Sequence, residues 1–137
     1  AGSSDIIVEN MAKWGLNLGL CFQMIDDLID ITGDTATIGK PAGSDIIQGK
    51  MTLVAIHANQ SELELPNFRR AFGNSDCSED VLSMAVDELR DSGSIEYARK
   101  KAIEHHSIAR GCLDNLEEND AVSVLRELTD YQLIRIN

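Results

Sequence analysis

The stretch that decides the fold spans nine residues and reads Phe22-Gln23-Met24-Ile25-Asp26-Asp27-Leu28-Ile29-Asp30. Around it, apolar residues recur at every third or fourth position from Ile7 to Ile29. This period predicts one helix from about Asp5 to Ile31. Gly33 follows and favours termination of that helix. Three acids therefore lie on the last turns of a mostly apolar helix.

These acids stand where a helix tolerates negative charge least. Asp26 and Asp30 are four residues apart and Asp27 and Asp30 are three apart, so their side chains can converge, with Gln23 one turn before them. Like charges at such spacings cost about 0.2–0.5 kcal/mol per pair. The negative end of the helix dipole adds roughly 0.3–1 kcal/mol for each acid. We expect a cation as their partner, and an acidic helix end that is simply solvated is the alternative.

A long loop, residues 32–50, follows the acids and carries the only two lysines of this region, Lys40 and Lys50. Long structured loops in compact domains are usually functional, and lysines bind phosphate as point charges. Carboxylates without Cys or His beside them suit a hard ion such as Mg2+, which shares its coordination with substrate phosphates. Together these residues predict a site for a metal-bridged diphosphate. The alternative is surface ion pairing between the lysines and the acids, worth about 0–1 kcal/mol.

The order and spacing of these residues resemble a known family over about thirty positions. They are similar to the second aspartate-rich motif and trailing loop of the trans-isoprenyl diphosphate synthases, the farnesyl and geranylgeranyl diphosphate synthase family. The matching residues are Phe22-Gln23-x-x-Asp26-Asp27-x-x-Asp30, Gly33-Asp34, Gly39-Lys40-Pro41, Gly43-Ser44-Asp45 and Gly49-Lys50-x-Thr52-Leu53. Gly93-Ser94-Ile95-x-Tyr97-Ala98 and Tyr131-Gln132-Leu133-Ile134-Arg135 resemble the last helices of that family, so the likeness extends over nearly the whole chain.

The resemblance implies a Mg2+-dependent prenyltransferase of isoprenoid biosynthesis. Such an enzyme condenses an allylic diphosphate with isopentenyl diphosphate, and its products include geranylgeranyl diphosphate. The roles implied for single residues are metal binding for Asp26, Asp27 and Asp30, binding of the allylic diphosphate and catalysis for Lys40 and Lys50, and contact with the isopentenyl group for Phe22 and Gln23.

The resemblance also implies parts that this sequence does not contain. The family pairs the motif with another aspartate-rich motif, with arginines and with a Lys-Thr pair, all upstream of where this chain begins. The run from Asp87 to Asp91 mimics the spacing, but its acids lie opposite an apolar helix face, which predicts a solvated surface. We therefore expect the C-terminal half of a prenyl synthase that needs its N-terminal half. A non-catalytic partner subunit and a related class I terpene cyclase or hydrolase are the alternatives.

Composition sets the remaining expectations. The chain has 137 residues, of which 43% are hydrophobic, so we expect one all-α domain over residues 1–137, a partial isoprenoid-synthase helical bundle. Its net charge of -11 argues against nucleic acid and anionic membrane surfaces as partners. Three cysteines without short spacing favour a reducing cytoplasm, and no membrane-spanning segment is visible. The apolar helix around Trp14 predicts burial by other helices, in a homo-oligomer or with a complementing N-terminal half.

Further helices are expected over residues 51–59, 67–72, 79–91, 94–118 and 120–135. Ser78 is the expected N-cap of the third of these. The last helix is predicted to turn a stripe inward that consists of Val124, Leu128, Tyr131 and Ile134. His57 is interpreted as a core or boundary residue. His105 and His106 are adjacent, so on a helix they cannot face one ligand together.

Overall fold

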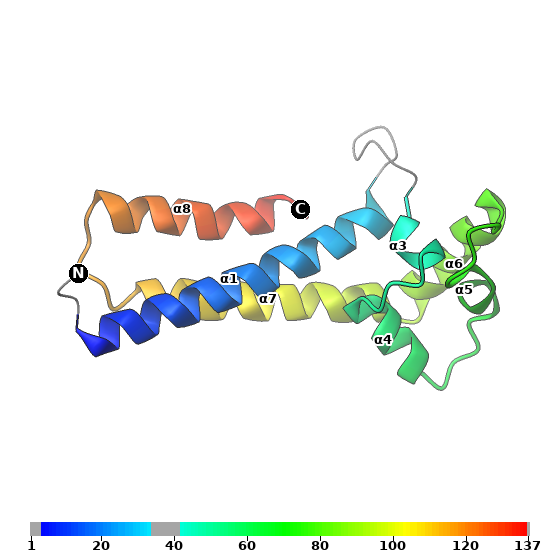
Figure 1. Ribbon diagram of the computed structural model, residues 1–137, viewed down its shortest axis with the longest axis horizontal. Helices are drawn as coiled ribbons and strands as arrows, with labels where there is room; N and C mark the ends of the chain where they lie inside the picture. The colour runs from blue at the N-terminus through cyan, green and yellow to red at the C-terminus, as the bar shows by residue number, and fades with distance from the viewer. Residues whose placement is uncertain (1–3, 34–41, 137) are drawn as a thin grey trace. The chain divides into compact units, whose positions relative to one another are not determined.

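The computed structural model describes residues 4–33 and 42–136, and every regular element within these ranges is a helix (Figure 1). The predicted all-α class is therefore confirmed. The elements are α1 (Asp5–Thr32), α3 (Ser44–Ile47), α4 (Leu53–Gln60), α5 (Pro66–Ala71), α6 (Glu79–Asp91), α7 (Ser94–Leu113) and α8 (Asp120–Ile134). Among the described residues, none of these helices combines the length and apolar character needed to cross a lipid bilayer.

The chain divides into two compact units. Unit 1 consists of Ala1–Ile25 with Lys101–Asn137, and unit 2 of Asp26–Lys100. The boundaries fall inside α1 and inside α7, so each of these helices contributes to both units. All three acids of the motif belong to unit 2. The expectation of a single domain over residues 1–137 stays a prediction.

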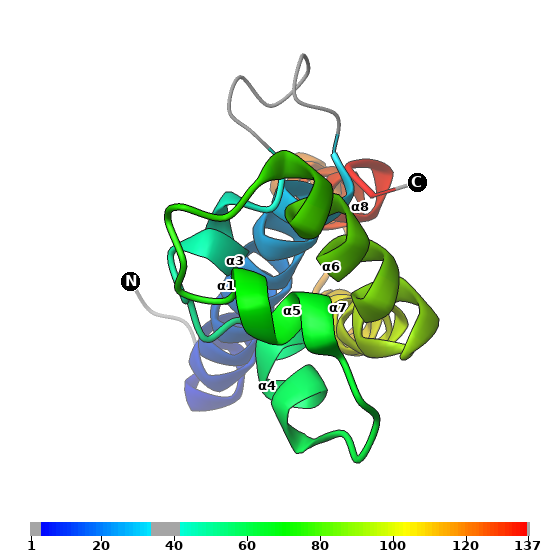
Figure 2. The same cartoon turned by 90° about the vertical axis from the view of Figure 1, so that its right-hand side faces the viewer.

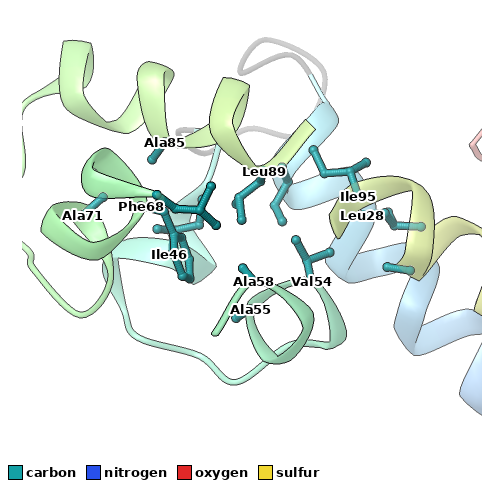
Figure 3. Packing of buried hydrophobic residues seen from close by; sticks show 13 residues of the cluster. Leu28, Ile46, Val54, Ala55, Ala58, Phe68, Ala71, Ala85, Leu89 and Ile95 are labelled. Carbon is teal, nitrogen blue, oxygen red and sulfur yellow. The ribbon is translucent and has the colours of Figure 1, made fainter. Parts of the chain in front are cut away.

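Unit 2 is built around one cluster of buried apolar side chains (Figure 3). They come from the last turns of α1, from the stretch that runs from α3 to α6, whose ribbon Figure 2 shows, and from the first two turns of α7. Phe68 is the largest side chain at its centre and is 1% exposed. The cluster comprises Leu28, Ile31, Ile46, Val54, Ala55, Ala58, Leu65, Phe68, Ala71, Ala85, Leu89, Ile95 and Ala98. Many of its members are alanines, so the helix backbones can approach one another closely.

Polar side chains set where the helices of unit 2 begin. The Thr52 hydroxyl accepts a hydrogen bond from the Ala55 N–H and caps α4, and Ser78 caps α6 as predicted, by accepting from the Val81 N–H. The α5 N-terminus is capped from another helix. There the Glu88 carboxylate accepts from the backbone N–H groups of Asn67 and Phe68 at 3.1 and 2.9 Å. The acids of α6 were expected on a solvated face, and Glu88 instead has this structural role.

The turn that leads into Lys50 requires glycine. Gly49 has φ +69°, in the left-handed region, and the Gly73 Cα lies 3.1 Å from where a Cβ on Gly49 would stand. The Gly73 N–H donates to the Ile46 carbonyl at 2.9 Å and holds the two backbones together. A side chain at position 49 would therefore meet both backbone strain and backbone atoms.

Unit 1 contains the larger part of α1, most of α7 and all of α8. The Trp14 indole N–H on α1 donates to the Thr129 hydroxyl on α8 at 2.9 Å. His105 and His106 on α7 have different partners, as their adjacency predicted. His105 Nδ1 lies 2.8 Å from Asn17 Oδ1 on α1, and His106 Nε2 lies 3.0 Å from Asp130 Oδ1 on α8.

The inward face predicted for α8 is wrong for this unit. Its apolar stripe is exposed, from 46% at Leu128 to 66% at Ile134. The buried positions are Val122, Thr129 and Gln132. Thr129 faces inward, and its hydroxyl accepts the hydrogen bond from the Trp14 indole N–H. A polar contact therefore lies on the inward face of α8, where apolar periodicity predicted an apolar stripe.

Two other boundaries differ from expectation. The stretch predicted as a continuous loop contains α3, and α7 ends at Leu113, before the predicted end near Glu118. At that end the Arg126 guanidinium of α8 donates to the Leu113 carbonyl at 3.3 Å, and the Leu116 N–H donates to the same carbonyl at 3.2 Å. Arg126 also pairs with Glu118 at 3.1 Å. These contacts satisfy the helix end and direct the chain into a turn.

Truncation of the central aromatic tests this description of the unit 2 core. Phe68→Ala is expected to lower the free energy of unfolding by about 3–5 kcal/mol, because it leaves a cavity in the middle of the cluster. Leu63→Ala is the matched control, since Leu63 is 54% exposed and its loss opens no cavity. Urea denaturation followed by circular dichroism measures both. Equal losses in the two variants would contradict the assigned core.

Candidate functional site

The end of α1 carries the acids, and the fold of unit 2 determines what each of them contacts. Asp27 is 9% exposed and Asp30 is 3% exposed, while Asp26 is partly buried. The helical spacing places Asp27 and Asp30 one turn apart, as the sequence predicted. Buried carboxylates need hydrogen bonds or positive charge around them, because the loss of hydration is costly. The neighbours of these acids therefore define the site.

Asp30 is held by the segment that opens α3. The Ser44 hydroxyl donates to Asp30 Oδ1 at 2.6 Å, and the Asp45 backbone N–H donates to Asp30 Oδ2 at 3.0 Å. The backbone N–H of Gly43 donates to the Asp30 carbonyl at 2.7 Å. Gly43 adopts φ +81°, a conformation that suits glycine. Both the main chain and the side chain of Asp30 thus fasten residues 43–45 to α1.

Asp27 is paired with a lysine. Lys50 Nζ lies 2.8 Å from Asp27 Oδ1 and 3.5 Å from Asp45 Oδ2. The hydrogen bond to Asp27 is the largest cause that raises the pKa of Lys50 above its ordinary value of 10.5, and desolvation acts in the opposite direction. The Lys50 side chain remains 46% exposed. Its ammonium group therefore touches the acids on one side and stays open to solvent.

The other predicted site residues are Lys40, Phe22 and Gln23. Lys40 lies outside the described residues. Phe22 and Gln23 belong to unit 1 and are exposed on α1. The Arg135 guanidinium lies 4.7 Å from the centroid of the Phe22 ring, a cation–π contact within unit 1. The roles expected for these residues stay predictions.

Two residues of the cluster had no role in the prediction. Ser44 and Asp45 are buried and contact Asp30 and Lys50 directly. The sequence does contain a signal for them, because they form part of the Gly43-Ser44-Asp45 triplet in the matching pattern. Their contacts with residues 14 positions away or more along the chain follow only from the fold.

The chemistry of the donors bears on metal binding. The cluster offers oxygen atoms alone, from carboxylates and a hydroxyl, and such donors suit Mg2+ rather than a softer ion. In the parts of the chain that the structure describes, no group of three or more His, Cys, Asp or Glu side chains is arranged to hold a metal ion. The acids instead receive a lysine, a hydroxyl and a backbone N–H. What they form is a charged cluster with an accessible ammonium group.

His57 also belongs to unit 2. Its Nδ1 is 3.0 Å from the hydroxyl of buried Ser94, and its ring stacks on Tyr97 with centroids 4.4 Å apart. It is partly buried. This is the boundary position that the sequence predicted, where one ring nitrogen is satisfied by hydrogen bonding.

Comparison with known proteins identifies the family. The family model described as "Polyprenyl synthetase" matches residues 1–89. The chain belongs to this family. It is 34% identical over 134 residues to a geranylfarnesyl diphosphate synthase of Natronomonas pharaonis, and 36% identical over 134 residues to a geranylgeranyl pyrophosphate synthase of Geoglobus acetivorans. Each match covers 98% of this chain but only 38% and 40% of the respective relative.

Solved structures of polyprenyl synthases share the fold. A geranylgeranyl pyrophosphate synthetase from Pyrococcus horikoshii matches with a TM-score of 0.86 and 30% identity, over 96% of this chain and 40% of that chain. A geranylgeranyl pyrophosphate synthase from Corynebacterium glutamicum, solved with isoprenyl diphosphate and magnesium, matches with a TM-score of 0.83 and 28% identity. That second match covers 98% of this chain and 39% of the other. The chain therefore spans about two-fifths of the length of these relatives.

The pairing of Lys50 with Asp27 predicts a pH dependence of stability. A pKa that is raised in the folded state means that the folded chain keeps a proton which the unfolded chain releases. The contribution of Lys50 is thus present below pH 10.5 and is lost as the pH rises through the folded pKa. Because the ammonium is half exposed, this contribution is expected to be at most about 1 kcal/mol.

Lys50→Gln should therefore flatten the fall in stability above pH 10.5, measured by urea denaturation at several pH values. Lys100→Gln removes the same charge from an exposed position of α7 and should leave the alkaline slope as it is in the parent chain. If the two variants show the same slope, the Lys50 ion pair does not contribute to folding.

Proposed function

We propose that this chain supplies the metal- and diphosphate-binding part of a trans-prenyl diphosphate synthase, which condenses an allylic diphosphate with isopentenyl diphosphate. The observation that carries the proposal is the Lys50 ammonium, half exposed and 2.8 Å from buried Asp27 at the end of α1, in a chain of the polyprenyl synthetase family. An ammonium group beside carboxylates suits a magnesium diphosphate, because lysine binds phosphate oxygens and carboxylates bind the ion.

The donor set fits Mg2+ with few protein ligands. Mg2+ is usually held by one or two carboxylates, while waters and substrate phosphates fill its other positions. A group of three acids is not needed for such a site. Asp26 and Asp27 are the residues we propose to hold the ion. Asp30, whose two carboxylate oxygens accept from Ser44 and Asp45, would act through a bound water or its remaining lone pairs.

The reaction in this proposal begins with heterolysis of the allylic carbon–oxygen bond, which leaves an allylic cation and diphosphate. Bound Mg2+ supplies electrostatic stabilisation of the negative charge that develops on the departing diphosphate. Lys50 shares this stabilisation through direct contact with phosphate oxygens, and Lys40 is expected to do the same. The double bond of isopentenyl diphosphate then attacks the cation. That attack forms the new carbon–carbon bond and leaves a second carbocation, which loses a proton to the released diphosphate and so gains a carbon–carbon double bond.

Lys50 must change partner for this to happen. In the structure its ammonium contacts Asp27 and lies close to Asp45, so these carboxylates hold it beside the place where we propose that a diphosphate binds. A diphosphate that arrives with Mg2+ brings negative charge for Lys50 and positive charge for Asp27 together. The Lys50–Asp27 ion pair would be replaced by two others, Lys50 with the diphosphate and Asp27 with Mg2+. No buried charge is then left without a partner, which lowers the free-energy cost of ligand binding.

The test is a calorimetric titration of inorganic diphosphate into the 137-residue chain, with and without Mg2+. The chain should bind diphosphate only when Mg2+ is present. The double variant Asp26→Asn, Asp27→Asn should weaken this binding at least tenfold, because it removes both proposed ligands with little change in shape. The control is Asp87→Asn, Asp91→Asn, which removes equal charge from exposed positions of α6 and should stay within twofold of the parent.

Equal diphosphate binding by the two double variants would overturn the assignment of the site. Lys50→Gln adds a check, since loss of a phosphate contact should weaken binding roughly tenfold, a difference of about 1.4 kcal/mol. Geranyl diphosphate in place of inorganic diphosphate shows whether an allylic ester is accepted.

A further inference from the structure

Ser44 and Asp45 are buried polar residues that the proposed reaction does not use. They are 7% and 8% exposed, respectively, and they open the short helix α3. Burial of a carboxylate and a hydroxyl at adjacent positions is costly unless both are engaged. Both are engaged with the residues that carry the proposed function, Asp30 and Lys50.

Asp45 contacts the site through three different groups. Its backbone N–H donates to Asp30 Oδ2 at 3.0 Å, and its backbone carbonyl accepts from the Lys50 N–H at 2.9 Å. Its side-chain Oδ2 lies 3.5 Å from Lys50 Nζ. Asp45 thus links the end of α1 to both ends of the Lys50 residue, its main chain and its ammonium.

The backbone on the far side of Lys50 is held as well. The Lys50 carbonyl accepts from the Thr52 N–H at 2.9 Å, and Thr52 is buried where it caps α4. The Lys50 main chain is therefore fixed between α3 and α4, and the freedom that remains lies in its side chain. Without a second carboxylate nearby, the long lysine side chain would have little to restrict it apart from Asp27.

Ser44 holds Asp30 by a hydrogen bond. Its hydroxyl donates at 2.6 Å, a short bond of the kind that a charged acceptor gives. Together with the Asp45 N–H, it engages both carboxylate oxygens of Asp30. Asp30 thus anchors residues 43–45. These residues begin the segment that leads to Lys50.

We propose that Ser44 and Asp45 are positioning residues, which use Asp30 as an anchor and hold the Lys50 ammonium beside Asp27, ready to receive a diphosphate. The proposal deepens the function proposed above and rests on it for the identity of the ligand. The positioning itself is a property of the chain without any ligand. It can therefore be tested separately from diphosphate binding.

The first test measures Lys50 in the absence of Mg2+ and diphosphate. Brief acetylation with an N-hydroxysuccinimide ester, followed by peptide mass spectrometry, gives the rate at Lys50 relative to exposed Lys100 in the same molecules. In the parent chain Lys50 should react several-fold more slowly than Lys100, because its amine is held by two carboxylates. Equal rates in the parent chain would overturn the proposal without the need for any variant.

The variants separate positioning from direct binding. Asp45→Asn should raise the relative rate at Lys50 about threefold or more and weaken Mg2+-dependent diphosphate binding about three- to tenfold. Ser44→Ala should weaken binding about threefold, and Ser44→Thr, which keeps the hydroxyl, should restore it. Ser83→Ala is the control, since Ser83 is exposed on α6 and should change neither readout.

Two further outcomes would distinguish the positioning role from the proposed function. If Asp45→Asn abolishes diphosphate binding as fully as the Asp26, Asp27 double variant while the Lys50 rate is unchanged, Asp45 is a ligand and the positioning role is wrong. If the parent chain binds no diphosphate but Lys50 is protected and is released by Asp45→Asn, the positioning role stands and the proposed function fails.

Discussion

The carboxylate of Asp30 is the contact on which the arrangement of unit 2 depends. It is almost fully buried, and a buried negative charge is tolerated only where donors replace the water that it has lost. Ser44 and the backbone of Asp45 provide those donors and thereby fix where the chain re-enters after the end of α1. The position of α3 follows from this, and so does the turn at Gly49 that presents Lys50. One helix-terminal acid thus holds residues 43–45 in place through polar contacts.

The crowded acids at the end of α1 are compensated by separate partners. Asp27 and Asp30 have different compensating groups, a lysine in one case and a hydroxyl with a backbone N–H in the other. Their mutual repulsion is reduced because each is paired within a few ångströms. The function that we propose for this cluster requires a ligand that carries both signs of charge, and a magnesium diphosphate has this property.

Unit 1 shows the opposite balance between polar and apolar contacts. Inside it, the three helices are joined by hydrogen bonds of Trp14, Asn17 and His106, while apolar side chains of α1 and α8 remain exposed. Specific polar pairs fix the rotation of a helix more strictly than apolar contacts do, since a buried donor without an acceptor is costly. The apolar stripe of α8, from Val124 to Ile134, lies on the exposed side of this helix.

The sequence by itself determined the all-α class, the extent of α1 and α6, the Ser78 cap and the motif of acids and lysines, because each of these is encoded by spacing within a few turns of the chain. Only the tertiary structure decided that the Lys50 ammonium pairs with Asp27 and that Asp30 anchors residues 43–45. It also decided that Thr129 rather than Leu128 faces the interior. These outcomes join residues 14 to 115 positions apart in sequence. No local period reports such pairings, since they depend on where the folded chain brings a donor to a buried acceptor.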